Sequence, residues 1–337
     1  MVLRLSSAGD VVLTAPALAA LRRAWPEARI LFATYAQYVP LLRGNPHVDA
    51  ILPVRRQAAL QSLLTQAFQA QPEALLDLHG KLRGWALRAL LWRRPASRWN
   101  RRPWQQTLAV RYGGARYRAE RTICRRYAGA VDALVGRRLV AEPLRYYVAA
   151  ADQAAADALL DRFGVGRSTP LVGMAPGAMW ATKRWPAARF AALARWLLAS
   201  GRQVVVTGGL SEAPLVQAVV AAAPGAVGIT READLGVLGG ILARCAAFVA
   251  NDSGPMHMAR GLGVPTLVLF GSTDPGQFDF TGHAMLRLGL DCSPCCFHGR
   301  PSCPRGHMRC LTGLEVAPAQ AALAGLLSRG AVNWVQG

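Results

Sequence analysis

Residues 249–271 have the sequence VANDSGPMHMARGLGVPTLVLFG, and this stretch decides the fold. It predicts a buried strand that ends in Asn251-Asp252, a turn at Ser253-Gly254-Pro255, a helix over 256–262 and a second strand over 266–270. Elements in this order form a parallel sheet, with the functional loops at the carboxyl ends of its strands. The turn brings a carboxylate, a hydroxyl and an imidazole to a helix N-terminus, where free backbone N–H groups favour anions. A phosphorylated or polyhydroxylated ligand is therefore expected here.

The same alternation of strands and helices continues through the chain. Strands are expected at 2–5, 29–33, 51–54, 74–78, 146–148, 171–175, 203–207, 226–229, 247–250 and 266–270. Helices are expected at 11–23, 38–43, 82–92, 123–134, 152–163, 186–200, 212–222 and 235–243. The character of the sequence changes near 150–168, which predicts two domains, 1–150 and 151–337. The expected fold class is α/β, with two parallel sheets facing a central cleft.

Composition favours a folded protein with a basic first half. The chain has 337 residues, of which 52% are hydrophobic, and no uninterrupted apolar run reaches the roughly 18–20 residues that span a bilayer. The N-terminus does not resemble a signal peptide, so a cytoplasmic protein is expected. Residues 1–150 contain 24 Lys+Arg against 8 Asp+Glu, and residues 151–337 contain 15 against 11. Either the first half meets an anionic partner, or its arginines form a solvated surface.

The first candidate site follows the first expected strand, in the segment RLSSAGDVVLTAP (4–16). A glycine turn is expected to open a helix there, with Asp10 at the mouth of the cleft. Aspartate caps helix N-termini well, which is one interpretation. The other is a general base that accepts the proton of a hydroxyl on the acceptor substrate. The motif alone leaves both open.

The second candidate site is the segment APGAMWATKRWP (175–186), which also follows an expected strand. The chain contains only two lysines, Lys81 and Lys183, against 37 arginines, so Lys183 is unlikely to be incidental. A compact ammonium can bind a diphosphate as a point charge, although a solvated surface charge is the alternative. In TGGLSE (207–212), Glu212 either accepts hydrogen bonds from ribose hydroxyls or lies in the first turn of a helix, where its negative charge interacts favourably with the helix dipole. No loop matches the dinucleotide pattern GxGxxG, which weakens a dehydrogenase interpretation.

Five of the seven cysteines lie between residues 292 and 310. Cys292, Cys295, Cys303 and Cys310 are spaced for tetrahedral binding of a structural zinc or iron ion, and reduced cysteines without a metal are the alternative. A disulfide framework is not expected.

A basic stretch runs from Lys81 to Arg102 without an acidic residue, and Trp85, Trp92 and Trp99 recur in it every seven residues. Tryptophans flanked by cations suit the surface of an anionic membrane or a phosphorylated glycolipid. They also suit nucleic acid. The third possibility is that the tryptophans are core residues and the arginines are solvated.

Taken in order, the segments resemble the ADP-heptose:lipopolysaccharide heptosyltransferases of glycosyltransferase family 9. The resemblance rests on RLSSAGDVVLTAPAL, NPHVDAI, LDLHGKLR, PGAMWATKRWP, VVVTGG, NDSGPMHMARGLGVPTLVLFGSTDP and CSPCCFHGRPSCPRGHMRCL. KRWP is closer to the second heptosyltransferase of the family than to the first. The resemblance implies a GT-B fold of two Rossmann-like domains, in which 1–150 binds the acceptor and 151–337 binds the nucleotide sugar.

The resemblance also assigns roles to residues. It implies that Asp10 is the catalytic base. It implies donor-binding roles for Gly177, Thr182, Lys183, Glu212, Asp252, Ser253, Gly254 and His257. Acceptor binding is expected at Ser7, Gly9, Lys81 and Arg83, and a structural metal knot at Cys292, Cys295, Cys303 and Cys310.

The implied reaction is an inverting transfer of heptose from ADP-heptose to the inner core, with lipid A–Kdo or heptosyl-Kdo as acceptor and no cofactor for catalysis. The expected location is the cytoplasmic face of the inner membrane, with the protein bound peripherally to the anionic surface near its phosphorylated lipid A–Kdo partner. One alternative is an enzyme of the same fold with another sugar donor or a protein acceptor. A basic, metal-containing nucleic-acid-binding protein is a weaker alternative, because charge alone does not require the Asp10, Lys183 and Asp252 loops.

Overall fold

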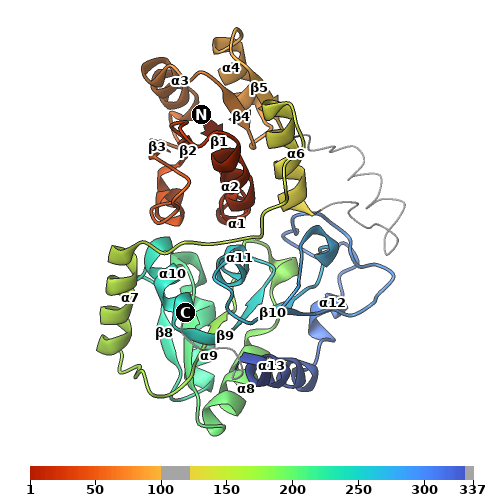
Figure 1. Ribbon diagram of the computed structural model, residues 1–337. Coiled ribbons are helices and arrows are strands. Elements are labelled where there is room, and N and C mark those ends of the chain that lie inside the picture. The colour runs from red at the N-terminus through yellow and green to blue at the C-terminus, as the bar shows by residue number, and fades with distance from the viewer. Residues whose placement is uncertain (100–121, 331–337) are drawn as a thin grey trace. The chain divides into compact units, whose positions relative to one another are not determined.

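The computed structural model describes residues 1–99 and 122–330 (Figure 1). The chain divides into two compact units, which meet in the sequence between Ala149 and Ala150. Each unit contains one sheet in which all neighbouring strands are parallel. The expected α/β class with two parallel sheets is therefore confirmed. No helix among the described residues has the length and apolar character that crossing a membrane requires.

The first unit has the sheet order β3-β2-β1-β4-β5 among its described residues. Helices α2 and α6 pack on each other, as do α3 and α4. Its elements are β1 (Val2–Leu3), α1 (Ala8–Val12), α2 (Ala15–Ala24), β2 (Leu31–Tyr35), the 3-10 helix η1 (Ala36–Leu41), β3 (Ala50–Val54), α3 (Ala59–Ala70), β4 (Leu75–Asp77), α4 (Leu82–Leu90), β5 (Ala96–Arg98) and α6 (Ile123–Val135).

The second unit has the sheet order β11-β10-β9-β6-β7-β8. Helices α8 and α9 pack together with α13 beside α8, while α7, α10 and α11 form another packed group. Its elements are α7 (Ala150–Arg162), β6 (Leu171–Ala175), η4 (Ala181–Lys183), α8 (Ala187–Ala199), β7 (Gln203–Thr207), η5 (Leu210–Glu212), α9 (Ala213–Ala222), β8 (Val227–Ile229), α10 (Leu235–Ala243), β9 (Cys245–Asn251), α11 (Gly254–Gly261), β10 (Thr266–Leu269), η6 (Pro275–Gln277), β11 (Ala284–Leu286), α12 (Arg309–Thr312) and α13 (Val316–Gly330).

Both sheets reverse their strand order at one point. In the first unit the reversal lies between β1 and β4, and in the second between β6 and β9. Loops that leave two such strands at their carboxyl ends diverge to opposite sides and open a crevice for ligands. Residues that follow β1 and β4, or β6 and β9, are therefore brought to one place in each unit.

Three expectations about local structure were wrong. The helix expected over 11–23 is two helices, because Thr14 and Pro16 begin α2 anew. The segment expected as a strand over 146–148 is irregular, and its backbone packs against Gly44, where a Cβ would come within 2.7 Å of it. The short strands β5 and β11 and the helices α3 and α13 were missed.

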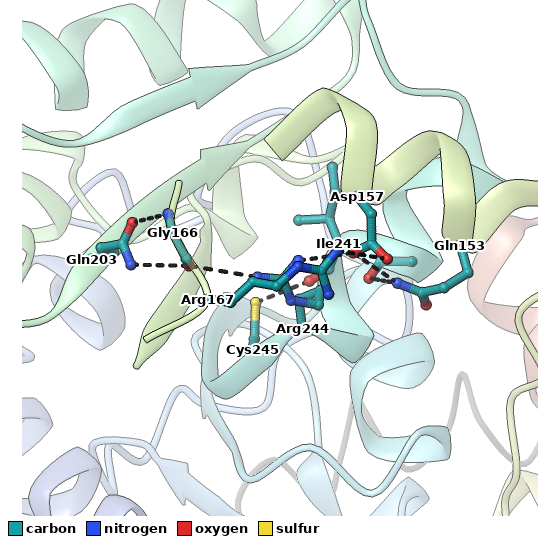
Figure 2. Close-up of polar contacts among 9 residues, drawn as sticks. Gln153, Asp157, Gly166, Arg167, Gln203, Ile241, Arg244 and Cys245 are labelled. Atoms are coloured by element: carbon teal, nitrogen blue, oxygen red, sulfur yellow. Dashed lines mark hydrogen bonds and ion pairs between the residues drawn. The ribbon is translucent and has the colours of Figure 1, made fainter. Parts of the chain in front are cut away.

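A polar network fixes helix α7 at the start of the second unit (Figure 2). The Asp157 carboxylate accepts from Arg244 Nη1 at 2.8 Å and pairs with Arg167 Nη2 at 3.2 Å. Gln203 bonds both the N–H and the C=O of Gly166. Hydrogen bonds from Arg244 and Arg167 lower the pKa of Asp157 below its usual value, so the carboxylate is ionised in the folded protein.

Replacing Asp157 by alanine should lower the free energy of unfolding by about 1–2 kcal/mol, because Arg244 and Arg167 lose their shared acceptor. Urea denaturation at neutral pH measures this. The matched control is Asp161→Ala, one turn further along α7, where the exposed side chain makes none of these bonds. Equal losses in the two variants would show that the network does not hold α7.

Candidate active site

Asp10 lies in the first turn of α1, not in a glycine turn, because Gly9 is itself helical. Its Oδ2 atom accepts from the Ser7 N–H and the Ser7 hydroxyl, each at 3.0 Å. The same oxygen pairs with Arg4 Nη2 at 2.6 Å. The Tyr127 hydroxyl lies 3.5 Å from Oδ1, and 27% of the Asp10 side chain is exposed. Asp10 therefore closes the helix start through Ser7 while Oδ1 keeps capacity to accept a further proton donor.

The buried Arg4 side chain positions the Asp10 carboxylate. Its side chain is 7% exposed, and Nη1 donates to the Leu78 carbonyl at 2.5 Å. The rings of Trp99 and Tyr127 lie 5.3 and 5.5 Å from the guanidinium carbon. Trp99 is thus a core residue, unlike Trp85 and Trp92. Because Leu78 follows β4 and Arg4 follows β1, one side chain joins the two loops at the reversal point of the sheet.

The pKa of Asp10 reflects this pairing. Burial acts to raise it, but the Arg4 charge and the Ser7 hydrogen bonds outweigh burial and lower the pKa to about 2. Asp10 is therefore an ionised acceptor at any physiological pH.

The β4–α4 loop carries the two expected acceptor-binding cations. Asp77 Oδ1 accepts from the N–H groups of His79 and Gly80 at 2.8 and 2.9 Å, which shapes the turn. Gly80 has a φ of 63°, a conformation that glycine adopts without strain. Lys81 then forms the N-cap position of α4, and Arg83 Nη1 donates to the Tyr35 hydroxyl at 2.8 Å. Ser7 and Lys81 are the N-cap residues of α1 and α4, and Gly9 and Arg83 lie in the first turns of these helices, which follow β1 and β4 in the first unit.

In the second unit, Lys183 and Asp252 form a nearly buried pair. Lys183 Nζ lies 2.7 Å from Asp252 Oδ2, and the two side chains are 14% and 7% exposed. The Thr273 hydroxyl donates to the same carboxylate oxygen at 2.6 Å. Burial acts to raise the pKa of Asp252, but the Lys183 ammonium and the Thr273 hydroxyl lower it below the usual value. The pair lies where the loops after β6 and β9 meet, so it occupies the reversal point of the second sheet.

Asn251 ties these two loops together. Its amide is fully buried, accepts from the Trp185 N–H at 3.0 Å and donates to the Pro176 carbonyl at 2.8 Å. Thr182 is also buried, and its hydroxyl bonds both the N–H and the C=O of Arg300. The expected donor contact of Thr182 therefore competes with bonds inside the protein.

Gly177 and Glu212 lie in contact. A Cβ on Gly177 would be 2.1 Å from the Glu212 carboxyl carbon, so this position has no room for a side chain. Glu212 Oε2 also accepts from the Gly209 N–H at 3.0 Å. The structure thus brings Glu212 beside the β6–α8 loop that contains Lys183.

Helix α11 begins at Gly254, with Ser253 as its N-cap residue. The Ser253 hydroxyl is buried and has no hydrogen-bond partner in the described part of the chain. His257 is buried, with its ring edge-on to Phe278 at 4.7 Å. Ser253 and the first N–H groups of α11 therefore remain the polar groups of this segment that are available to a ligand.

The cysteine segment does not form the expected metal site. Over residues 1–99 and 122–330, no three His, Cys, Asp or Glu side chains are grouped to hold a metal ion. Backbone bonds fix the segment instead, because the N–H groups of Cys295 and Cys296 both donate to the Ser272 carbonyl. Cys292 faces His307, with Sγ and Nε2 3.8 Å apart. None of the seven cysteines forms a disulfide in the structure.

Sequence patterns missed several residues that shape these edges. Arg4 looked like part of a strand, and its partner Leu78 is 74 residues away. Ser272 and Thr273 follow β10 in the segment GSTDP, a polar turn after a buried strand, which is the same signal that marked Asn251 and Asp252.

Solved structures place the fold in a known class. A glycosyltransferase family 9 protein from Veillonella parvula matches with a TM-score of 0.79 and 23% identity, over 97% of this chain and 96% of the other. The Escherichia coli ADP-heptose lps heptosyltransferase II matches with a TM-score of 0.75 and 20% identity, over 98% and 99%. The fold is therefore the GT-B fold of glycosyltransferases.

The family model of glycosyltransferase family 9 (heptosyltransferase) matches residues 99–300, and the chain belongs to this family. Lipopolysaccharide heptosyltransferase 1 of Pseudomonas aeruginosa is 26% identical over 88% of this chain and 85% of its own length. Lipopolysaccharide heptosyltransferase 2 of Escherichia coli is 33% identical over 36% of this chain and 36% of its own length. The protein is a glycosyltransferase, and these identities do not single out one member of the family.

Because of the Arg4–Asp10 pair, the free energy of unfolding should fall as the pH is lowered below about 4. The folded pKa of about 2 lies below the roughly 3.9 of an unfolded aspartate, so the stabilisation is complete above about pH 4 and is lost as pH falls toward 2. The stability advantage of the wild type over Asp10→Asn should shrink by about 1–2 kcal/mol between about pH 6 and 2.5. Urea denaturation across this range measures it.

The control is Asp132→Asn on α6, since that carboxylate bonds only the Leu139 N–H and no cation in the described structure. A constant difference between wild type and Asp10→Asn would contradict the pairing.

Proposed function

We propose that the protein transfers heptose from ADP-heptose, with inversion, to the phosphorylated inner core of lipopolysaccharide. The acceptor is lipid A–Kdo or heptosyl-Kdo. The observation that carries this proposal is the Lys183–Asp252 pair at the reversal point of the second sheet. A lysine beside a helix start and a polar loop is suited to a sugar diphosphate, and membership of a heptosyltransferase family supports heptose as the sugar.

The donor diphosphate would bind Lys183. Transfer leaves a negative charge on the departing ADP, and an ammonium held in place by Asp252 stabilises that charge without reorganisation. The Ser253 hydroxyl and the first N–H groups of α11 offer further donors. Glu212, next to Gly177, would accept hydrogen bonds from the ribose.

Asp10 would accept the proton of the acceptor hydroxyl. The hydroxyl oxygen forms the new bond to the anomeric carbon while the bond to the diphosphate breaks, and the proton passes to the carboxylate. Because the pKa of Asp10 is about 2, this transfer becomes favourable only once the attacking oxygen has begun to bond and has become acidic. The proton then leaves Asp10 readily for water.

The acceptor is anionic, and the first half of the chain suits it. Lys81 and Arg83 lie on the loop beside Arg4 and Asp10, and would bind phosphate or carboxylate groups of the glycolipid. This acceptor lies in a membrane, so we also propose that the protein acts as a peripheral protein on the anionic cytoplasmic face of the inner membrane. A different sugar donor or a protein acceptor on the same fold is the competing function.

Calorimetric titration tests the donor directly. ADP-heptose should bind more tightly than ADP, UDP-glucose or GDP-mannose, and transfer to the inner-core acceptor should follow. Tighter binding of another nucleotide sugar would show that heptose is not the donor sugar.

Replacing Asp10 by asparagine should lower the transfer rate by about 10²–10⁴-fold, because no other group then takes the proton. Affinity for the donor should stay within about twofold, since Asp10 belongs to the first unit. Steady-state kinetics and calorimetry on the same preparation measure both quantities. Loss of donor affinity with an unchanged rate constant would remove Asp10 from the role of base.

Replacing Lys183 by alanine should weaken ADP-heptose binding by about 10–100-fold, as expected for the loss of a hydrogen-bonded cation. Lys81→Ala removes the chain's only other lysine and is the matched control. It should leave donor affinity unchanged and raise the KM for the acceptor. An unchanged donor affinity in Lys183→Ala would refute the diphosphate role.

A further inference from the structure

Helix α4 has an apolar stripe on the side that faces away from the core. Leu82, Trp85 and Ala89 follow one another at intervals of three or four residues, which places them on one face of α4, and Trp92 lies in the turn that follows the end of the helix at Leu90. Leu82, Trp85 and Trp92 are 86%, 56% and 70% exposed. The opposite side of the helix packs into the protein through Gly84 and Leu87, both buried. This exposed stripe, with Ala89, is called the outer face of α4.

Cations surround the outer face. Within the described residues 81–99 there are six basic side chains and no acidic one: Lys81, Arg83, Arg88, Arg93, Arg94 and Arg98. Two of the arginines stack on the exposed indoles, Arg98 over Trp85 and Arg93 over Trp92, each at 4.6 Å from the ring centre. Each of the two exposed indole rings therefore has a guanidinium group stacked on it.

The neighbouring helix α3 continues the same character (Figure 1). It packs on α4 and contains no charged residue, and its Leu60 and Phe68 are 45% and 68% exposed. Two adjacent helices of the first unit thus show large apolar side chains to the outside. Such a patch on a folded protein marks an interaction surface.

We propose that the outer face of α4 is a docking surface for an anionic phospholipid bilayer, with Trp85 and Trp92 inserted among the lipid headgroups. Indoles favour the membrane–water interface because the ring is apolar and its N–H is polar. The arginines beside them are placed to meet lipid phosphates, so apolar burial and charge attraction act on the same face. A protein partner of the usual mixed surface would leave most of these six cations without counter-charges.

The placement of the helix links this surface to the reaction, and in that respect the inference rests on the proposed function. Lys81 and Arg83 begin α4, so the docking surface starts at the loop proposed to bind the acceptor headgroup. A bilayer held against the outer face would present its glycolipid headgroups at that loop.

Co-sedimentation with vesicles tests the surface without any assay of transfer. The wild type should bind vesicles of phosphatidylcholine and phosphatidylglycerol at least tenfold more tightly than vesicles of phosphatidylcholine alone. The double variant Trp85→Ala/Trp92→Ala should lose tenfold or more of this affinity, and so should Arg93→Gln/Arg94→Gln.

The controls match each change. Phe163→Ala removes another exposed ring with an arginine, Arg162, stacked on it at 5.3 Å, and should bind as the wild type does. Arg137→Gln/Arg138→Gln removes two exposed adjacent arginines of the same unit. Equal losses in the controls, or unchanged vesicle binding in the α4 variants, would overturn the proposal. Preferential binding of the wild type to duplex or single-stranded DNA over anionic vesicles would overturn it as well.

Transfer assays separate this inference from the proposed function. The tryptophan variant should keep the wild-type rate on a de-acylated, water-soluble acceptor and lose rate only on the acceptor embedded in vesicles. If the wild type transfers heptose to neither acceptor, the proposed function fails while the vesicle result still stands. If the variant loses rate equally on both acceptors, the outer face is not a membrane surface.

Discussion

The buried Arg4 guanidinium holds together the segments that follow β1 and β4 in the first unit. A charge in this position is tolerated only when it is paired and its N–H groups are used. Arg4 is paired with the Asp10 carboxylate through Nη2 and donates to the Leu78 carbonyl through Nη1, while its buried Nε has no hydrogen-bond partner among the described residues, and the rings of Trp99 and Tyr127 lie close to the guanidinium carbon. The segments that supply these partners lie far apart in the sequence. One side chain therefore fixes where Asp10 stands relative to the β4–α4 loop.

In the second unit, a neutral amide rather than a charged side chain joins the two loops at the point where the strand order reverses. Its sheet has the same reversal of strand order, and the loops after β6 and β9 must be joined there. The neutral amide of Asn251 makes the tie by bonding Trp185 and Pro176. Because a neutral group makes this tie, the charged pair of Lys183 and Asp252 beside it is not needed to close the loops.

How far the sequence predicts this structure depends on the kind of signal. Long apolar strands and capped helices were recognised from local pattern, and α10, expected over 235–243, has those bounds. Strands β5 and β11 were missed because three residues at a sheet edge show no period. The residues 146–148 have strand-like composition, but they form no strand and their backbone packs against Gly44. The cysteine spacing allowed a metal site, yet backbone bonds to Ser272 determine that segment. Contacts between segments that lie far apart in the sequence, such as those between the cysteine segment and Ser272, leave no local pattern from which they could be predicted.

The low pKa of Asp10 has a chemical cost and a compensating benefit. Pairing with Arg4 makes the carboxylate a weaker base than a free aspartate. An unpaired carboxylate at the same place would repel an acceptor that bears phosphate and carboxylate groups. With Arg4 paired to it, the group formed by Arg4, Asp10, Lys81 and Arg83 has a net positive charge, which would attract the anionic acceptor that we propose toward the proposed base. A positive charge beside Asp10 would attract an anionic acceptor, but it also lowers the pKa of the carboxylate and so makes it a weaker base. The buried Arg4 side chain gives the site the positive charge at the expense of basicity.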